Sequence, residues 1–266
     1  MFTITNYVTA QSLEEAYALL GKNKTNKILG GTLWMRMGTQ NIHTAIDLSQ
    51  LGLDQITESE TYIEIGAMCS LRTLEIHPLI TNTFDGILST CVKDIVGVQF
   101  RNCATIGGSV YSKFGFSDVL TALLALDTYV ELYNGGIISL ESFIQQPYKK
   151  DILVKVLIKK ETTKGIYTTE RLSHTDFPVL AVAVTHSEKG YKISVGARPS
   201  KAALALEAMS FLNGLDVDQL NDENMKVAAR KVANELQFGS NMRATGAFRQ
   251  HLAEVLVKRA LNALSY

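Results

Sequence analysis

The segment Arg101-Asn102-Cys103-Ala104-Thr105-Ile106-Gly107-Gly108-Ser109 contains a Gly-Gly pair flanked by hydroxyl residues, and a similar pair lies earlier in the chain, in Leu29-Gly30-Gly31-Thr32. In chain order, Gly30-Gly31 is the first pair and Gly107-Gly108 is the second. Without a Cβ, a Gly-Gly pair lets the backbone approach a ligand closely and can turn several N–H groups toward one anion. Two such segments could therefore hold a pyrophosphate together. Tight turns explain an isolated Gly-Gly pair equally simply, and that alternative stays open for both segments.

Around Gly30-Gly31, the N-terminal residues alternate between helix and strand patterns. Ser12 has capping-box spacing and begins a helix that Gly21 is expected to end. Strands are expected at residues 27–29, directly before the first Gly-Gly pair, and at residues 44–48. This order predicts a small α/β unit over residues 1–52.

Residues 53–160 surround the second pair and have a different pattern. Apolar and polar residues alternate through 62–67, and Asn-Gly-Gly at 134–136 is a strong hairpin signal. These features favour an antiparallel sheet. The uncharged segment 119–126 is typical of a buried helix, and the polar segment 159–165 is a plausible linker.

Beyond the linker, residues 165–266 predict three strands followed by three helices, which is an α+β pattern. The strands are expected at 167–172, 179–185 and 191–195, and the helices at 201–212, 218–236 and 247–264.

Composition limits the class of protein. Hydrophobic residues make up 46% of the 266 residues, which is enough for a packed core. The 26 basic and 26 acidic side chains balance, which argues against a nonspecific polyanion-binding protein. The first residues show no signal-peptide pattern, no segment has the length of a membrane span, and the three scattered cysteines suit a reducing cytoplasm.

Few side chains suggest catalysis. None of the five histidines has ligand spacing with another histidine or a cysteine, so we expect neither a metal site nor catalytic residues. Asp118 could accept hydrogen bonds from ligand hydroxyls, although a first-turn acid of the following helix explains it as well. Trp34 could stack on a ligand ring, although a lone tryptophan is more often a core residue.

Six segments, in order along nearly the whole chain, resemble the FAD-binding (medium) subunits of the molybdenum hydroxylase family, which includes xanthine dehydrogenase and carbon monoxide dehydrogenase. Segment 98–109 is similar to the second flavin loop of that family and segment 28–32 to the first. The segments are Ile28–Thr32, Val98–Ser109, Asp118, Leu123–Asp127, Ile193–Pro199 and Arg243–Arg249.

The resemblance implies an α+β fold with a PCMH-type FAD-binding domain at residues 1–160, divided at residue 52 into two subdomains. A C-terminal domain like that of the CO dehydrogenase flavoprotein follows at 165–266, with three antiparallel strands and a three-helix bundle. FAD would be bound without a covalent link. The residues implied to contact it are Ile28, Leu29, Gly30, Gly31, Thr32, Leu33, Trp34, Ile95, Ala104, Thr105, Ile106, Gly107, Gly108, Ser109, Asp118 and Leu153.

Some positions depart from the family pattern. Ser109 replaces the usual Asn, Phe114-Gly115-Phe116 stands where a Pro is usual before Asp118, and the last motif has Thr245 and Phe248 for Ser and Tyr. The shorter side chain of Ser109 puts one side-chain contact to the flavin in doubt.

As a function, the resemblance implies a cytoplasmic, heteromeric oxidoreductase. Electrons would pass from two [2Fe–2S] clusters on a small subunit to this FAD and on to NAD or another acceptor. Substrate, a purine by the frequency of such enzymes in the family, would be hydroxylated at a molybdopterin cofactor on a large subunit. Two alternatives stay open: a non-catalytic assembly module with a weak flavin site, and a stand-alone FAD oxidoreductase of the vanillyl-alcohol oxidase type.

Overall fold

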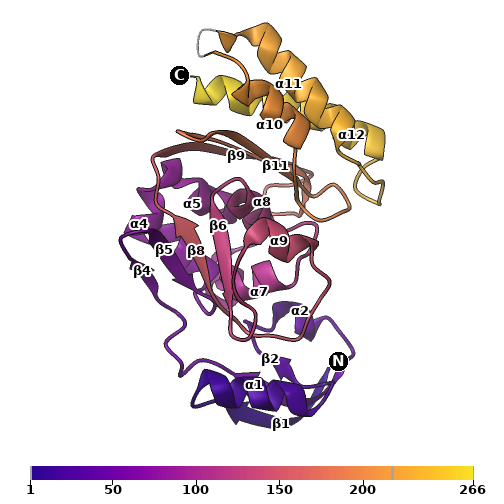
Figure 1. Cartoon of the computed structure of the whole chain (residues 1–266). Helices are drawn as coiled ribbons and strands as arrows, with labels where there is room; N and C mark the ends of the chain where they lie inside the picture. The colour runs from indigo at the N-terminus through magenta and orange to yellow at the C-terminus, as the bar shows by residue number, and fades with distance from the viewer. Residues whose placement is uncertain (1, 217–218, 266) are drawn as a thin grey trace. The chain divides into compact units, whose positions relative to one another are not determined.

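The computed structural model describes residues 2–216 and 219–265 (Figure 1). The chain forms two compact units, each made from several segments. The first unit comprises Met1–Thr73, Val98–Ser112 and Thr128–Lys160, and the second comprises Leu74–Gly97, Lys113–Asp127 and Glu161–Tyr266. The expected division into domains at 1–160 and 165–266 stays a prediction.

The first unit begins with a three-stranded parallel sheet of order β1-β3-β2. The strands are β1 (Thr3–Thr9), β2 (Lys27–Ile28) and β3 (Asn41–Asp47). Strands β2 and β3 were predicted from the sequence, whereas β1 was not. The small α/β unit expected at the N-terminus is present.

Helix α1 (Leu13–Lys22) covers this sheet and buries Ala16 and Leu20 in its core. Ser12 is the N-cap, and its hydroxyl accepts from the Glu15 amide at 3.1 Å, as the sequence predicted. The expected end at Gly21 is wrong. The helix continues through Gly21 and stops only at the extended residue Asn23.

A five-stranded antiparallel sheet of order β4-β5-β8-β6-β7 completes the first unit and confirms the antiparallel expectation. Its strands are β4 (Ile56–Glu58), β5 (Tyr62–Gly66), β6 (Thr128–Leu132), β7 (Gly136–Ser139) and β8 (Leu153–Lys159).

Four short helices belong to the first unit. They are α2 (Leu33–Arg36), α6 (Val98–Cys103), α7 (Ile106–Tyr111) and α9 (Leu140–Gln145). The second Gly-Gly pair therefore lies in the first turn of a helix, α7, and not in an open loop.

The second unit contains further short helices. The chain passes into it from the first unit within α3 (Leu71–Ile76), at residues 73 and 74. The further helices are α4 (Pro78–Thr81), the 3-10 helix η1 (Phe84–Gly86), α5 (Ile87–Val92) and α8 (Asp118–Leu124), which is buried along its whole length, as predicted.

The C-terminal part of the second unit has an antiparallel sheet of order β12-β11-β10-β9. The three expected strands are β9 (Thr163–Arg171), β10 (Pro178–Ser187) and β11 (Gly190–Gly196). The short strand β12 (Ala203–Leu204) adds a fourth, because Leu204 pairs with Ser194 of β11.

Three helices follow: α10 (Leu206–Asn213), α11 (Asp222–Glu235) and α12 (Gly246–Leu264). Helix α10 begins later than the expected residue 201, because β12 occupies the preceding residues. The expected start of the second helix at residue 218 lies outside the described residues. Apolar side chains of the helices and of β10 and β11 form one core, which confirms the predicted α+β arrangement of strands followed by helices.

Candidate functional site

The first Gly-Gly segment is a left-handed turn between β2 and α2. Gly31 has φ +75°, and Thr32, the N-cap of α2, has φ 61° and ψ 2°. A Cβ at Gly31 would collide with the carbonyl oxygen of Cys103. Glycine is therefore required here both by the backbone angle and by the close approach of another segment.

The structure brings the two Gly-Gly segments together within the first unit. A Cβ placed on Gly30 would lie 3.2 Å from Oγ1 of Thr105 and 3.7 Å from Cα of Gly108. The backbones of the turn and of the first turn of α7 thus lie side by side, with no side chain from either glycine between them.

The two segments differ in how their amides are used. The amides of Ile106 and Gly107 donate to the carbonyls of Cys69 and Ala67 at 2.9 and 2.8 Å, and that of Gly108 donates to the Thr105 hydroxyl at 3.1 Å. The α7 end of the site therefore has no free amide in its first turn.

In the turn, by contrast, the amides of Gly30, Gly31, Thr32 and Leu33 donate to no acceptor within residues 2–216 and 219–265. Each of these residues is partly exposed. Successive free amides in a turn form a concave anion-binding surface. The amides that are available to an anion at this candidate site thus lie in residues 30–33.

Gly107 is packed closely against Ala67. A Cβ there would lie 2.6 Å from the carbonyl oxygen and 2.9 Å from Cβ of Ala67. Close packing inside α7 thus accounts for glycine at position 107, whereas Gly108 is exposed and faces Gly30.

The other predicted apolar contacts have mixed environments. Leu153 begins β8 and is buried, and Trp34 in α2 is 40% exposed, so it is not a core residue. Ile95 is partly exposed and, like Asp118, belongs to the second unit. Ser109 is half-buried, and its hydroxyl donates to the Thr105 carbonyl at 3.0 Å.

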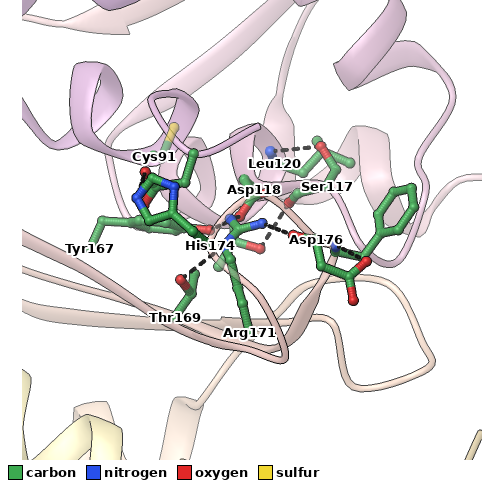
Figure 2. A network of polar contacts seen from close by, with 12 residues as sticks. Cys91, Ser117, Asp118, Leu120, Tyr167, Thr169, Arg171, His174 and Asp176 are labelled. Atoms are coloured by element: carbon green, nitrogen blue, oxygen red, sulfur yellow. Dashed lines mark hydrogen bonds and ion pairs between the residues drawn. The ribbon is translucent and has the colours of Figure 1, made fainter. Parts of the chain in front are cut away.

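Asp118 is the first residue of α8, after the N-cap Ser117, and it is buried in a polar network (Figure 2). The Tyr167 hydroxyl donates to its Oδ1 at 2.5 Å, and the guanidinium of Arg171 forms a buried ion pair with the same oxygen. Both described side-chain contacts of this carboxylate thus end on one oxygen.

Burial raises the pKa of Asp118 to about 6, against the opposing effects of Arg171 and Tyr167. Burial likewise raises the pKa of Tyr167 and of the Cys91 thiol, and the Asp118 charge adds to both shifts. At neutral pH the network therefore holds a carboxylate, a guanidinium, a phenol and a thiol.

Arg171 joins three parts of this network, as Figure 2 shows. Besides Asp118, its Nε donates to the Thr169 hydroxyl at 3.2 Å and its Nη1 donates to the Asp176 carbonyl at 2.5 Å. Asp176 also pairs with Arg243 at 3.3 Å.

Sequence reasoning missed Tyr167 and Arg171. Both lie in β9 at alternate positions with Thr169, so period-two spacing places the three side chains on one face of the strand. Nothing in that spacing indicates a carboxylate about fifty residues earlier as their partner.

No helix in the described ranges combines the length and apolar character needed to cross a lipid bilayer. Within the same ranges, no three His, Cys, Asp or Glu side chains are grouped as metal ligands would be.

Free amides at residues 30–33 beside the glycines of α7 suit an anionic group, and two family models show that the chain is a subunit of the flavoprotein class. Residues 2–160 match the family model for the FAD-binding domain in molybdopterin dehydrogenase, and residues 167–264 match the CO dehydrogenase flavoprotein C-terminal domain. The chain belongs to this family of FAD-binding medium subunits of molybdenum hydroxylases.

Curated relatives match over nearly the whole chain. The nicotine 6-hydroxylase medium subunit of Paenarthrobacter nicotinovorans is 24% identical over 96% of this chain and 95% of the relative. The glyceraldehyde dehydrogenase medium chain of Sulfolobus acidocaldarius is 24% identical over 98% of both.

Solved structures share the fold. A chain of carbon monoxide dehydrogenase from Hydrogenophaga pseudoflava superposes with a TM-score of 0.88 at 22% identity, covering 98% of this chain and 97% of that one. A chain of quinoline 2-oxidoreductase from Pseudomonas putida gives 0.87 at 19% identity, covering 99% of both.

Proposed function

We propose that this chain holds FAD at the paired glycine segments and transfers electrons through it within a molybdenum hydroxylase complex. The single observation that carries the proposal is the row of free amides at residues 30–33, next to a glycine-lined face of α7. Such a row suits a diphosphate, which needs several donors and close backbone approach.

The two segments have different tasks in this proposal. The turn at residues 30–33 donates hydrogen bonds to the pyrophosphate. Helix α7 donates none from its first three residues and instead leaves space, because Gly108 has no side chain facing Gly30. The remaining contacts proposed for FAD are Ile28, Leu29, Trp34, Ile95, Ala104, Thr105, Ile106, Gly107, Ser109 and Leu153.

Asp118 is proposed to accept a hydrogen bond from a ribityl or sugar hydroxyl of FAD. Tyr167 and Arg171 both bind Oδ1, and the carboxylate also accepts from its own backbone amide, so a ligand hydroxyl would be an additional donor to Oδ2. The two neighbours also fix the rotamer of the carboxylate before any ligand binds.

When bound, FAD supplies the redox chemistry through its isoalloxazine ring. This chain contributes binding and orientation. We further propose that the partners are an iron–sulfur small subunit and a molybdopterin-binding large subunit, that the complex is cytoplasmic, and that NAD is the final acceptor.

The substrate proposal is a purine, with xanthine dehydrogenase as the model activity. Two relatives are named for nicotine and glyceraldehyde, and these are the competing substrate classes. Anaerobic addition of hypoxanthine, nicotine or glyceraldehyde to the purified complex, followed by NAD, separates them. Bleaching of the flavin band with the purine alone, followed by NADH formation, is the expected result.

Reconstitution with FAD tests the binding site. We expect the full chain to take up FAD, with flavin absorbance near ~450 nm. Gly31→Ala inserts a Cβ against Cys103 and should weaken FAD binding at least tenfold, and Gly30→Ala should weaken it less. Gly136→Ala is the matched control, since Gly136 also has positive φ but open space around it.

Circular dichroism shows whether each variant folds. If Gly31→Ala does not, the milder Gly30→Ala decides. No flavin uptake by the folded wild-type chain would favour the assembly-module alternative. Equal FAD affinity in Gly30→Ala, Gly136→Ala and wild type would show that the glycine turn is not part of the FAD-binding site.

A further inference from the structure

Strand β1 is an edge strand without the protection that the other edge strands have. Six strands lie at the edges of the three sheets in residues 2–216 and 219–265. Free strand edges pair readily with other chains, and proteins usually shorten, charge or cover them. Strand β1 is neither short nor charged, and no strand other than β3 covers it within the described ranges.

The other five edges are short, charged or covered. Strands β2 and β12 have two residues each, β4 has three and β7 has four. Strand β9 is long, but it carries Lys164, Glu170 and Arg171, and the carboxylate of Asp85 accepts from its outward Gly165 amide at 3.1 Å.

Strand β1 has seven residues, Thr-Ile-Thr-Asn-Tyr-Val-Thr, with no charge, no proline and no glycine. It pairs only with β3 and forms the outer edge of its sheet (Figure 1). Residues 3–7 are exposed on both faces, with Ile4 at 40% and Tyr7 at 59%. This strand therefore offers an outer edge that no other strand of the described ranges covers, together with apolar side chains. The Thr9 carbonyl, at the end of the strand, accepts from the Gln11 side-chain amide at 3.1 Å.

The sequence of β1 is self-complementary in antiparallel pairing. With Asn6 on a two-fold axis, Ile4 of one copy lies opposite Val8 of the other, and Thr5 lies opposite Tyr7. Thr3 then lies opposite Thr9. Pairs of β-branched residues with each other or with aromatic residues stabilise antiparallel sheets, and the absence of charge removes repulsion between copies.

We propose that two copies of this chain associate through β1, with antiparallel pairing about a two-fold axis at Asn6. The two N-terminal sheets then form one continuous six-stranded sheet. A two-fold interface uses the same patch on both copies, as this pairing does. The glycine turn at residues 30–33 follows β2, at the opposite edge of the sheet, so pairing through β1 leaves it uncovered.

Sedimentation of the full chain over a range of concentrations tests the proposal. We expect a species of twice the 29.2 kDa chain mass to form as the concentration rises. Asn6→Lys places two like charges directly opposite each other and should shift the chain to monomer. Asn6→Thr, a neutral β-forming control, should remain dimeric. Mixing Asn6→Lys with Asn6→Glu chains should restore the dimer.

A cysteine cross-link tests the register. In a Cys103→Ser background, which removes the exposed native thiol, Asn6→Cys should form a disulfide-linked dimer on mild oxidation. Opposed residues in a ladder meet the distance that a disulfide needs. Thr3→Cys is the control, because it would lie opposite Thr9 and not opposite its own copy.

Three results would overturn the proposal. They are a monomeric wild-type chain at all concentrations, a dimer that Asn6→Lys leaves intact, and cross-linking of Thr3→Cys as efficient as that of Asn6→Cys. A monomeric chain in which Asn6→Lys abolishes co-purification with partner subunits would assign the edge to a strand of a partner instead. Circular dichroism of each variant distinguishes lost pairing from lost folding.

Discussion

The phenolic oxygen of Tyr167 lies 2.5 Å from Oδ1 of Asp118, so a residue of β9 provides a hydrogen bond to the first residue of α8. Both groups are buried, and Arg171 pairs with the same oxygen. The position of the carboxylate is thus fixed by β9, which lies about fifty residues later in the sequence, and not by the helix alone.

Tyr167→Phe should destabilise the protein, because it removes a hydrogen bond from a buried carboxylate while keeping the ring. The expected loss in the free energy of unfolding is about 1–3 kcal/mol, measured by urea denaturation. Tyr191→Phe is the control, since its hydroxyl has no hydrogen-bond partner within the described ranges. A loss as large in Tyr191→Phe would show that the Asp118 contact is not the cause.

Ionisation of Asp118 should lower stability as the pH rises. The pKa of this group is about 6 in the folded protein against an ordinary 3.8 in the unfolded chain. The folded state thus binds the proton more tightly, and its contribution is largest near pH 4 and lost through pH 6. The loss is up to about 3 kcal/mol, at about 1.4 kcal/mol per pKa unit.

Asp118→Asn cannot titrate and isolates this effect. The free energy of unfolding of wild type minus that of Asp118→Asn should fall between about pH 4 and pH 6 and then become constant. A difference that rises with pH over this range would mean that Arg171 outweighs burial and holds the pKa of Asp118 below its usual value.

Gly21→Ala should stabilise the protein by about 0.5–1 kcal/mol, because Gly21 is a helical residue in the last turn of α1, one residue before the end of the helix at Lys22. An added Cβ would meet nothing within 4 Å. Gly52→Ala provides the comparison, with equal space but φ +65°, and it should destabilise. Thermal unfolding of both variants checks this. A destabilised Gly21→Ala would support the prediction from the sequence that the helix ends at Gly21.

Much of the fold follows from local sequence. Ser12 marks its helix, alternation marks β5, and Asn-Gly-Gly marks the hairpin, because each signal arises from neighbouring residues. Strand β1 was missed although Thr3–Thr9 is rich in β-branched residues. The prediction that α1 ends at Gly21 was wrong, because a glycine does not by itself end a helix when the backbone can continue in helical geometry.

The candidate site was less predictable. The Gly-Gly pairs indicate close approach, but only the fold shows that Gly107 packs on Ala67 and that the free amides lie in the other segment. Arg171 and Asp118 meet through tertiary structure, which spacing does not encode. Resemblance to the family named the residues, and the structure separates those that can donate from those that shape the site.

Arg249 of α12 should be the most damaging arginine to replace in the C-terminal part. It is 1% exposed, and its Nε donates to the Val179 carbonyl at 2.9 Å. Its terminal nitrogens donate to the carbonyls of Gly239 and Ala244 and to Oδ1 of Asn241 at 2.7–2.8 Å. One guanidinium thus satisfies the turn at 239–244 and the first strand residues of β10.

Arg249→Lys keeps the charge but cannot reach four acceptors with one ammonium group. We expect a loss of about 3 kcal/mol or more in the free energy of unfolding and faster amide hydrogen exchange across residues 239–246. Arg230→Lys is the matched control: this side chain is 60% exposed and contacts Glu254 at 3.4 Å, so it should change stability by less than about 1 kcal/mol. Unchanged exchange in the 239–246 segment of folded Arg249→Lys would show that backbone contacts alone hold this turn.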